Sequence, residues 1–205
     1  MRYTLTDENA LVLDYTATTD APTIINLTNH SYFNLEGQSS GSMLEQTLCL
    51  NASTFTEGNA ETCPTGRILP VAGTPMDFTR AKPIGRDIQA EYSQLQMCGG
   101  YDHNFILDKE PGMLALAAVA RSEKTGITME TYTTQPGVQL YTFNKVEAPL
   151  TGKDGQPMKP HTAFCLETQF YPDSVHHENF PFQYLQPGQP FTTRTEYRFS
   201  VKSKS

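Results

Sequence analysis

The segment Phe191-Thr192-Thr193-Arg194-Thr195-Glu196-Tyr197-Arg198-Phe199 alternates more regularly than any other part of the chain. Successive side chains of an extended strand point to opposite faces, so every second residue shares a face. One face then holds two phenylalanines, a tyrosine and two threonines, whereas the other holds a threonine, two arginines and a glutamate. This pattern predicts a β-strand with one apolar face and one polar face at the end of the chain.

Five other segments show the same extended character: Ala10–Thr18, Leu114–Arg121, Ile127–Thr134, Val138–Phe143 and Thr162–Phe170. Only Ile84–Gln96 has apolar residues at helical spacing, and it is the one helix we expect. Short strands, with 14 Pro and 14 Gly and almost no helical period, predict an all-β fold, an antiparallel β-sandwich. We find no internal repeat or linker, and therefore expect residues 1–205 to form a single domain.

The composition excludes several classes of partner. The chain of 205 residues carries 15 Lys and Arg against 22 Asp and Glu, a net charge of −7. An acidic protein of this kind is a poor ligand for nucleic acid or for an anionic membrane. No apolar run approaches the length of a membrane span, and the first residues do not resemble a signal peptide. The four cysteines are widely spaced, which indicates reduced thiols and a cytoplasmic location.

A second informative segment is Ile25-Asn26-Leu27-Thr28-Asn29-His30-Ser31-Tyr32-Phe33-Asn34-Leu35. It carries more hydrogen-bonding groups than a plain core strand, where each buried polar group needs a partner. It is also too apolar for a plain loop. We interpret it as the floor of a polar pocket with His30 at its centre. His30 is then a general acid or base, a metal ligand, or a core histidine hydrogen-bonded to its asparagine neighbours.

Two carboxylates are candidates to face His30. Strand alternation places Glu167 on the face that Cys165 and Gln169 share, and a Glu in a central strand needs a functional reason to lose its hydration. The alternative is an edge strand with Glu167 in water. Asp102 suits a hydroxyl-binding carboxylate, or else a turn-forming Asp after two glycines.

Other chemistry has little support in the sequence. Asp102 and His103 are candidate metal ligands together with His30 and Glu167, but no spacing matches a known metal motif. There is no G-x-S-x-G elbow, no glycine-rich phosphate loop and no dinucleotide fingerprint. Cys165 has no electropositive neighbours in sequence and is interpreted as a small apolar residue.

The segment Asn26–Leu35 resembles the signature of the aldose 1-epimerases, also called galactose mutarotases. Three further segments agree in order: Gly100–Leu107, Pro136–Tyr141 and Cys165–Gln169, the last followed by Pro172-Asp173-Ser174. The resemblance spans essentially all 205 residues.

The resemblance implies a galactose mutarotase-like supersandwich with the site in a cleft on one face. It implies interconversion of the α and β anomers of free aldohexoses, galactose or glucose, without a metal or an organic cofactor. Glu167 stands at the position of the catalytic base and His30 at that of the catalytic acid, acting from opposite sides of the sugar ring. Asp102 and Gln139 stand at positions that hydrogen-bond sugar hydroxyls.

The chain also departs from the family pattern. Family members carry an N-terminal half that supplies an Asn-Arg pair and another histidine to the sugar, and neither has a counterpart here. The resemblance therefore implies an N-terminally truncated sandwich, whose exposed sheet edges would favour self-association. Two alternatives to an active enzyme remain: a carbohydrate-binding remnant with reduced or no turnover, and a β-sandwich interaction module whose polar clusters are structural networks.

Overall fold

The computed structural model describes residues 1–146 and 150–201, and it confirms the expected antiparallel β-sandwich. Every strand pair in the described residues is antiparallel. The single domain expected over 1–205 also includes residues 147–149 and 202–205, which lie outside the described part.

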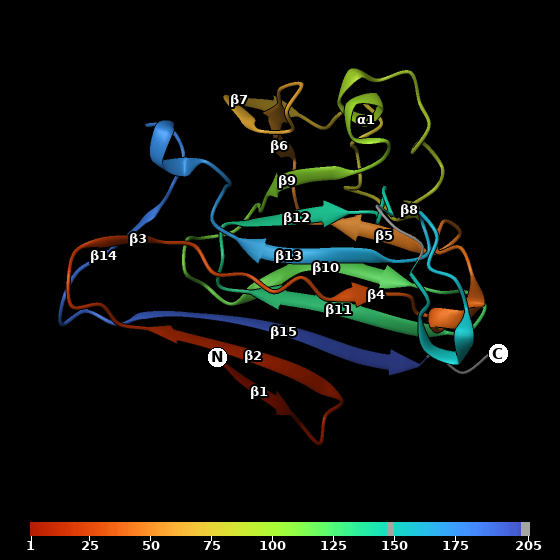
Figure 1. The fold of residues 1–205 in the computed structure, drawn as a ribbon, viewed down its shortest axis with the longest axis horizontal. Helices are drawn as coiled ribbons and strands as arrows, with labels where there is room; N and C mark the ends of the chain where they lie inside the picture. The colour runs from red at the N-terminus through yellow and green to blue at the C-terminus, as the bar shows by residue number, and fades with distance from the viewer. Residues whose placement is uncertain (147–149, 202–205) are drawn as a thin grey trace.

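The larger sheet has seven strands and is organised around the C-terminal strand. The order across the sheet is β1 (Arg2–Leu5), β2 (Ala10–Ala17), β15 (Phe191–Val201), β11 (Ile127–Thr133), β10 (Ala115–Arg121), β5 (Thr47–Leu50) and β8 (Lys82–Pro83). The alternation predicted for β15 holds in part: Thr195 and Tyr197 are fully buried, and Arg194 and Arg198 are exposed. Glu196 departs from it, because it is buried between these two arginines and forms ion pairs with both. In Figure 1 this strand lies between β2 and β11.

The second sheet has six strands. Their order is β4 (Tyr32–Phe33), β13 (Phe164–Gln169), β12 (Gly137–Tyr141), β9 (Asp102–Ile106), β6 (Thr54–Gly58) and β7 (Pro64–Pro70). A two-stranded sheet of β3 (Thr23–Ile25) and β14 (Gln183–Leu185) lies at one end of the molecule (Figure 1). β13 pairs with β12 along its length and with β4 at its start, and Glu167 is buried, so the alternative of an edge strand with Glu167 in water is wrong.

The two large sheets enclose one apolar core, and β13 is held to β15 across it. The Tyr197 hydroxyl donates a hydrogen bond of 2.8 Å to the carbonyl of Leu166. The Tyr197 ring also packs on Phe33, with ring centroids 4.8 Å apart. These contacts hold β13 against the core on its inner side. The side chains on its outer side therefore do not have to pack in the core and can take part in a site.

The helix expected at Ile84–Gln96 is mostly absent. Helix α1 covers only Ser93–Cys98, and the other helical segments are the 3₁₀ turns η1 (Gln38–Ser40), η2 (Lys153–Gly155) and η3 (Ser174–His176). The backbone amides of Ile84 and Gly85 instead donate to carbonyls of the segment before β5. The apolar residues of the expected helix are buried, so their spacing reflects burial in the core rather than a helical period. None of the helices within 1–146 and 150–201 is long and apolar enough to cross a bilayer.

Candidate active site

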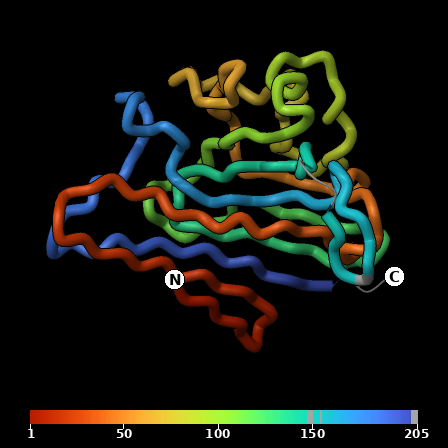
Figure 2. Tube along the Cα trace, viewed as in Figure 1, coloured from red at the N-terminus to blue at the C-terminus, as the bar shows by residue number. Residues whose placement is uncertain are grey.

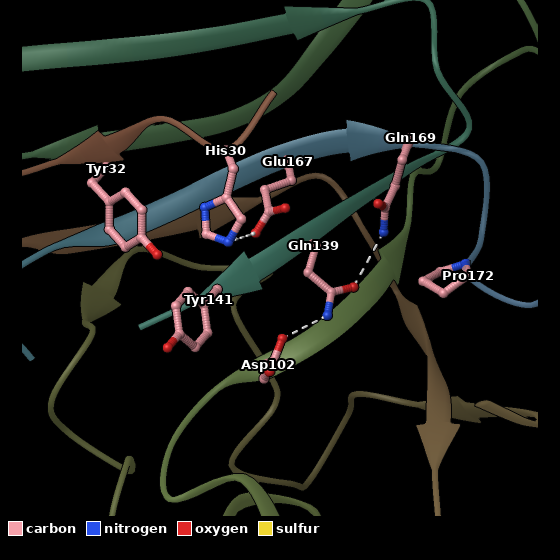
Figure 3. Close-up of a pocket in the computed structure, with 8 residues that line it drawn as sticks. All are labelled: His30, Tyr32, Asp102, Gln139, Tyr141, Glu167, Gln169 and Pro172. Carbon is pink, nitrogen blue, oxygen red and sulfur yellow. Dashed lines mark hydrogen bonds and ion pairs between the residues drawn. The ribbon is translucent and has the colours of Figure 1, made fainter. Parts of the chain in front are cut away.

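Strand register brings the predicted residues together on the outer face of the six-stranded sheet. Tyr32 of β4 pairs with Cys165 of β13, and the same antiparallel register continued by two residues places His30 opposite Glu167. Glu167 in turn pairs with Gln139 of β12. His30 precedes β4 and is not itself in a strand, but its chain still runs beside β13 (Figure 3).

A second row lies one pleat away on the same face. It consists of Tyr32, Cys165, Tyr141 and Asp102, each paired with the next across the sheet. The two rows border a pocket of about 330 Å³, within the usual size range of small-molecule sites. The side chains lining it are His30, Tyr32, Asp102, Gln139, Tyr141, Glu167, Gln169 and Pro172 (Figure 3).

His30 and Glu167 contact each other at the floor of this pocket. His30 Nε2 lies 3.5 Å from Glu167 Oε1. The His30 side chain is 50% exposed and that of Glu167 only 11%. Since His30 is half open to solvent, the alternative of a core histidine is wrong. The spacing is also too short for the two groups to act from opposite sides of a sugar ring, as the resemblance had implied.

Asp102 and Gln139 form the other polar side of the pocket. Gln139 Nε2 donates to Asp102 Oδ1 at 2.8 Å, a diagonal contact between neighbouring strands (Figure 3). Asp102 is the first residue of β9 and its side chain lines the pocket, so it does not belong to a turn after Gly99 and Gly100. All four sequence-predicted site residues therefore border one pocket.

Comparison with known proteins places this arrangement in a family. The aldose 1-epimerase family model matches residues 1–198. The chain belongs to the aldose 1-epimerase family. It is 40% identical over 199 residues to a galactose mutarotase of Rattus norvegicus and 33% identical over 201 residues to an aldose 1-epimerase of Escherichia coli.

Solved structures of aldose epimerases agree with the fold. A GalM/aldose epimerase homologue from C. elegans matches with a TM-score of 0.85 and 31% identity, over 98% of this chain and 59% of that one. A galactose 1-epimerase from Lactobacillus acidophilus matches with a TM-score of 0.81 and 27% identity, over 98% and 56%. The two sequence relatives are matched over 97% of this chain, but the chain spans only 56% and 57% of their length.

Burial changes the acid–base properties of the two carboxylates in this pocket. Burial, and secondarily the Asp102 carboxylate, raise the pKa of Glu167 to about 7. Burial also raises the pKa of Asp102, an effect that the hydrogen bond from Gln139 opposes. A carboxylate with a pKa near 7 combines a substantial ionised fraction with a strong affinity for protons, which is what a general base needs.

One group of possible metal donors occurs among the described residues. Atoms of His30, Cys165 and Glu167 lie within 4.8 Å of one another. Burial, and then the charges of Glu167 and Asp102, raise the pKa of the Cys165 thiol. His103, considered above as a ligand, is buried with its ring edge-on to Phe55, and burial lowers its pKa to about 4.

Sequence reasoning did not select four of the residues that line the pocket: Tyr32, Tyr141, Gln169 and Pro172. Strand alternation places Gln169 on the same face as Glu167, and Tyr141 on the same face as Gln139. The sequence therefore contained evidence for two of the four residues, Gln169 and Tyr141. The missing information was the register, which shows that these faces are the same face of one sheet.

Proposed function

We propose that the chain interconverts the α and β anomers of free aldohexoses, galactose or glucose, by general acid–base catalysis of ring opening. The observation that carries the proposal is the contact of Glu167, with a pKa of about 7, and His30, at 3.5 Å, on the floor of a sugar-sized pocket. The chain's membership of the aldose 1-epimerase family supports the reaction class. The proposal concerns a chain that spans about half the length of these relatives.

In the proposed reaction Glu167 takes the proton of the anomeric hydroxyl while protonated His30 gives a proton to the ring oxygen. The bond from C1 to the ring oxygen breaks, and a carbonyl forms at C1. Rotation about C1–C2 presents the other carbonyl face, and closure returns both protons with the roles reversed. The anomeric oxygen and the ring oxygen are both bonded to C1, so a base and an acid that are 3.5 Å apart can serve both atoms.

Asp102 and Gln139 are proposed to bind sugar hydroxyls, since each presents polar atoms to the pocket. Tyr32 and Tyr141 flank His30, with ring centroids 4.8 Å and 5.7 Å from the imidazole. The Tyr32 ring is stacked on the His30 imidazole, and this contact limits rotation of the imidazole. The Tyr141 ring packs against the same imidazole in a T-shaped arrangement (Figure 3). The aromatic rings also offer flat apolar surface to the C–H groups of a sugar.

Polarimetry of freshly dissolved α-galactose with the purified chain tests the proposal. A first-order approach to equilibrium that accelerates in proportion to protein concentration supports it. Sugar binding by titration calorimetry without acceleration would identify a carbohydrate-binding remnant instead. If the chain neither binds galactose nor accelerates the reaction, the polar clusters are structural networks and the proposal fails.

Asp102→Asn is expected to move the low-pH limb of kcat/KM toward lower pH. Below the pKa of Glu167 the base is protonated, and kcat/KM falls about tenfold per pH unit. The Asp102 charge raises that pKa, so removing the charge lowers the pKa and extends activity to more acidic solution. The position of the limb is measured rather than its height, because Asp102 also contributes to binding. Asp14→Asn, in β2 of the other sheet, serves as the control, and an unmoved limb in Asp102→Asn would contradict the assigned coupling.

We also propose that two copies associate along β1. This strand is hydrogen-bonded to β2 on one side only and ends the seven-stranded sheet (Figure 2). All four of its residues are exposed, with Tyr3 at 61% and Leu5 at 80%. An open strand edge with apolar side chains is a template for pairing with another strand.

Light scattering after size exclusion is expected to give a dimer for the wild-type chain and a monomer for Leu5→Lys, because a lysine on an edge strand opposes pairing. Val175→Lys is the matched control, since Val175 is an exposed apolar residue in η3, outside the sheets. A wild-type chain that stays monomeric at micromolar concentration rules out this association.

A cytoplasmic location is part of the same proposal. It is supported by Cys49, Cys63, Cys98 and Cys165 all being free thiols. Free thiols are typical of proteins that work in a reducing compartment.

A further inference from the structure

A small cavity adjoins the candidate active site on the side of β6. It measures about 20 Å³, which is room for about one water-sized oxygen. It shares Asp102, Gln139 and Pro172 with the main pocket, so the two spaces border each other. Asn104 of β9 also lines the cavity and is only 2% exposed.

A chain of side-chain amides leads from Asp102 to Asn104. Gln139 Nε2 donates to Asp102 Oδ1 at 2.8 Å, and because a carboxylate only accepts, Gln139 must turn its oxygen the other way. That oxygen accepts from Gln169 Nε2 at 3.2 Å. The same Gln169 nitrogen donates to Asn104 Oδ1 at 3.4 Å. The carboxylate at one end thus sets the direction of all three amides.

The last amide is left with an unused donor. Asn104 Nδ2 is buried and has no hydrogen-bond partner in the described residues. Its oxygen is directed at β12, since a Cβ on Gly137 would lie 2.5 Å from Asn104 Oδ1. The nitrogen is bonded to the same amide carbon as this oxygen, and on the other side of β9, residues Thr56 and Gly58 of β6 line the small cavity together with Asn104. A buried amide donor without a partner is unfavourable, so a ligand for it is expected.

We propose that Asn104 is the donor of an accessory oxygen-binding subsite beside the sugar pocket. Its ligand is one acceptor oxygen, either a hydroxyl of the bound aldose or a resident water. Asn104 would then help decide which aldoses the pocket accepts, and Gln169 would orient it. This inference deepens the proposed function and rests on it only where the oxygen belongs to the sugar.

The test combines two variants with a set of sugars. Asn104→Asp keeps the oxygen that accepts from Gln169 but removes the donor, and Asn104→Leu removes both at similar volume. Titration calorimetry of galactose and its monodeoxy derivatives gives their dissociation constants for each protein. Asn51→Asp, which changes an exposed asparagine next to β5 of the other sheet, is the matched control. Crystal structures of the wild-type chain with and without galactose locate any oxygen near Asn104 Nδ2.

If the ligand is a sugar hydroxyl, one monodeoxy sugar binds the wild-type chain about 3- to 10-fold more weakly than galactose does. Both Asn104 variants lose that difference, whereas Asn51→Asp keeps it. A purely structural role for Asn104 would weaken all sugars alike and leave the difference in place.

If the ligand is a resident water, the crystals show an oxygen at hydrogen-bond distance from Asn104 Nδ2 even without sugar. This result upholds the subsite even if the chain binds no galactose, in which case only the proposed function fails. The inference is overturned if no monodeoxy difference is lost in the variants and no oxygen lies within hydrogen-bond distance of Asn104 Nδ2 in either crystal.

Discussion

Glu167→Gln is expected to lower the catalysed rate of galactose anomer interconversion by about 100- to 10,000-fold, the usual contribution of a positioned general base. The amide has nearly the shape of the carboxylate but cannot take the anomeric proton. Polarimetry gives the rate, and circular dichroism confirms that the variant is folded. Binding of galactose should persist, since Asp102 and Gln139 are unchanged.

His30→Ala provides the comparison within the same site. We expect a loss of similar size, because ring opening without proton donation to the ring oxygen leaves a poor leaving group. The double variant should lose little more than either single variant, since groups that act as a unit are not additive. Full activity in Glu167→Gln would show that another group is the base and would remove the assignment.

The same Glu167→Gln substitution is expected to stabilise the fold at neutral pH. The carboxyl group has an ordinary pKa of 4.5, which burial raises to about 7 in the folded chain. Between these values the folded state binds more protons than the unfolded state, so the stability of the wild-type chain falls as pH rises. Above pH 7 the ionised, buried carboxylate destabilises the wild-type chain by about 3 kcal/mol. The glutamine amide of Glu167→Gln does not ionise, so the free energy of unfolding of this variant does not fall for this reason as pH rises.

Urea unfolding of both proteins between pH 4 and pH 8 measures this effect. The difference in free energy of unfolding should be near zero at pH 4 and approach its full size at pH 8. Glu45→Gln, at an exposed position ahead of β5, should change stability by less than about 0.5 kcal/mol at every pH. An equal difference at pH 4 and pH 8 would mean that the Glu167 pKa is not raised.

A loss of catalytic rate together with a gain of stability in Glu167→Gln would show that Glu167 serves catalysis and lowers the stability of the fold. The fold accepts the buried charge because β13 is anchored on its inner face by Tyr197, through the hydrogen bond to Leu166. The Glu167 carboxylate also lies 3.5 Å from the imidazole of His30, whose side chain is half exposed and can exchange protons with water.

The amino-acid sequence by itself determined the fold class, six of the fifteen strands in the described residues (β2, β10, β11, β12, β13 and β15) and the residue types of the site. Alternation identified β15 and the outer face of β13, because side-chain direction in a strand depends only on neighbours along the chain. The motifs around His30, Asp102, Gln139 and Glu167 were sufficient to indicate the family.

Only the tertiary structure decided how those residues meet. The expected helix at Ile84–Gln96 proved to be largely turns, because burial in the core produced the same apolar spacing as a helix would. The contact of His30 with Glu167, and the amide chain from Asp102 to Asn104, depend on the register of β4, β13, β12 and β9. The pattern of each strand fixes which side chains share a face, but which residues of two distant strands stand opposite each other depends on how those strands pack together.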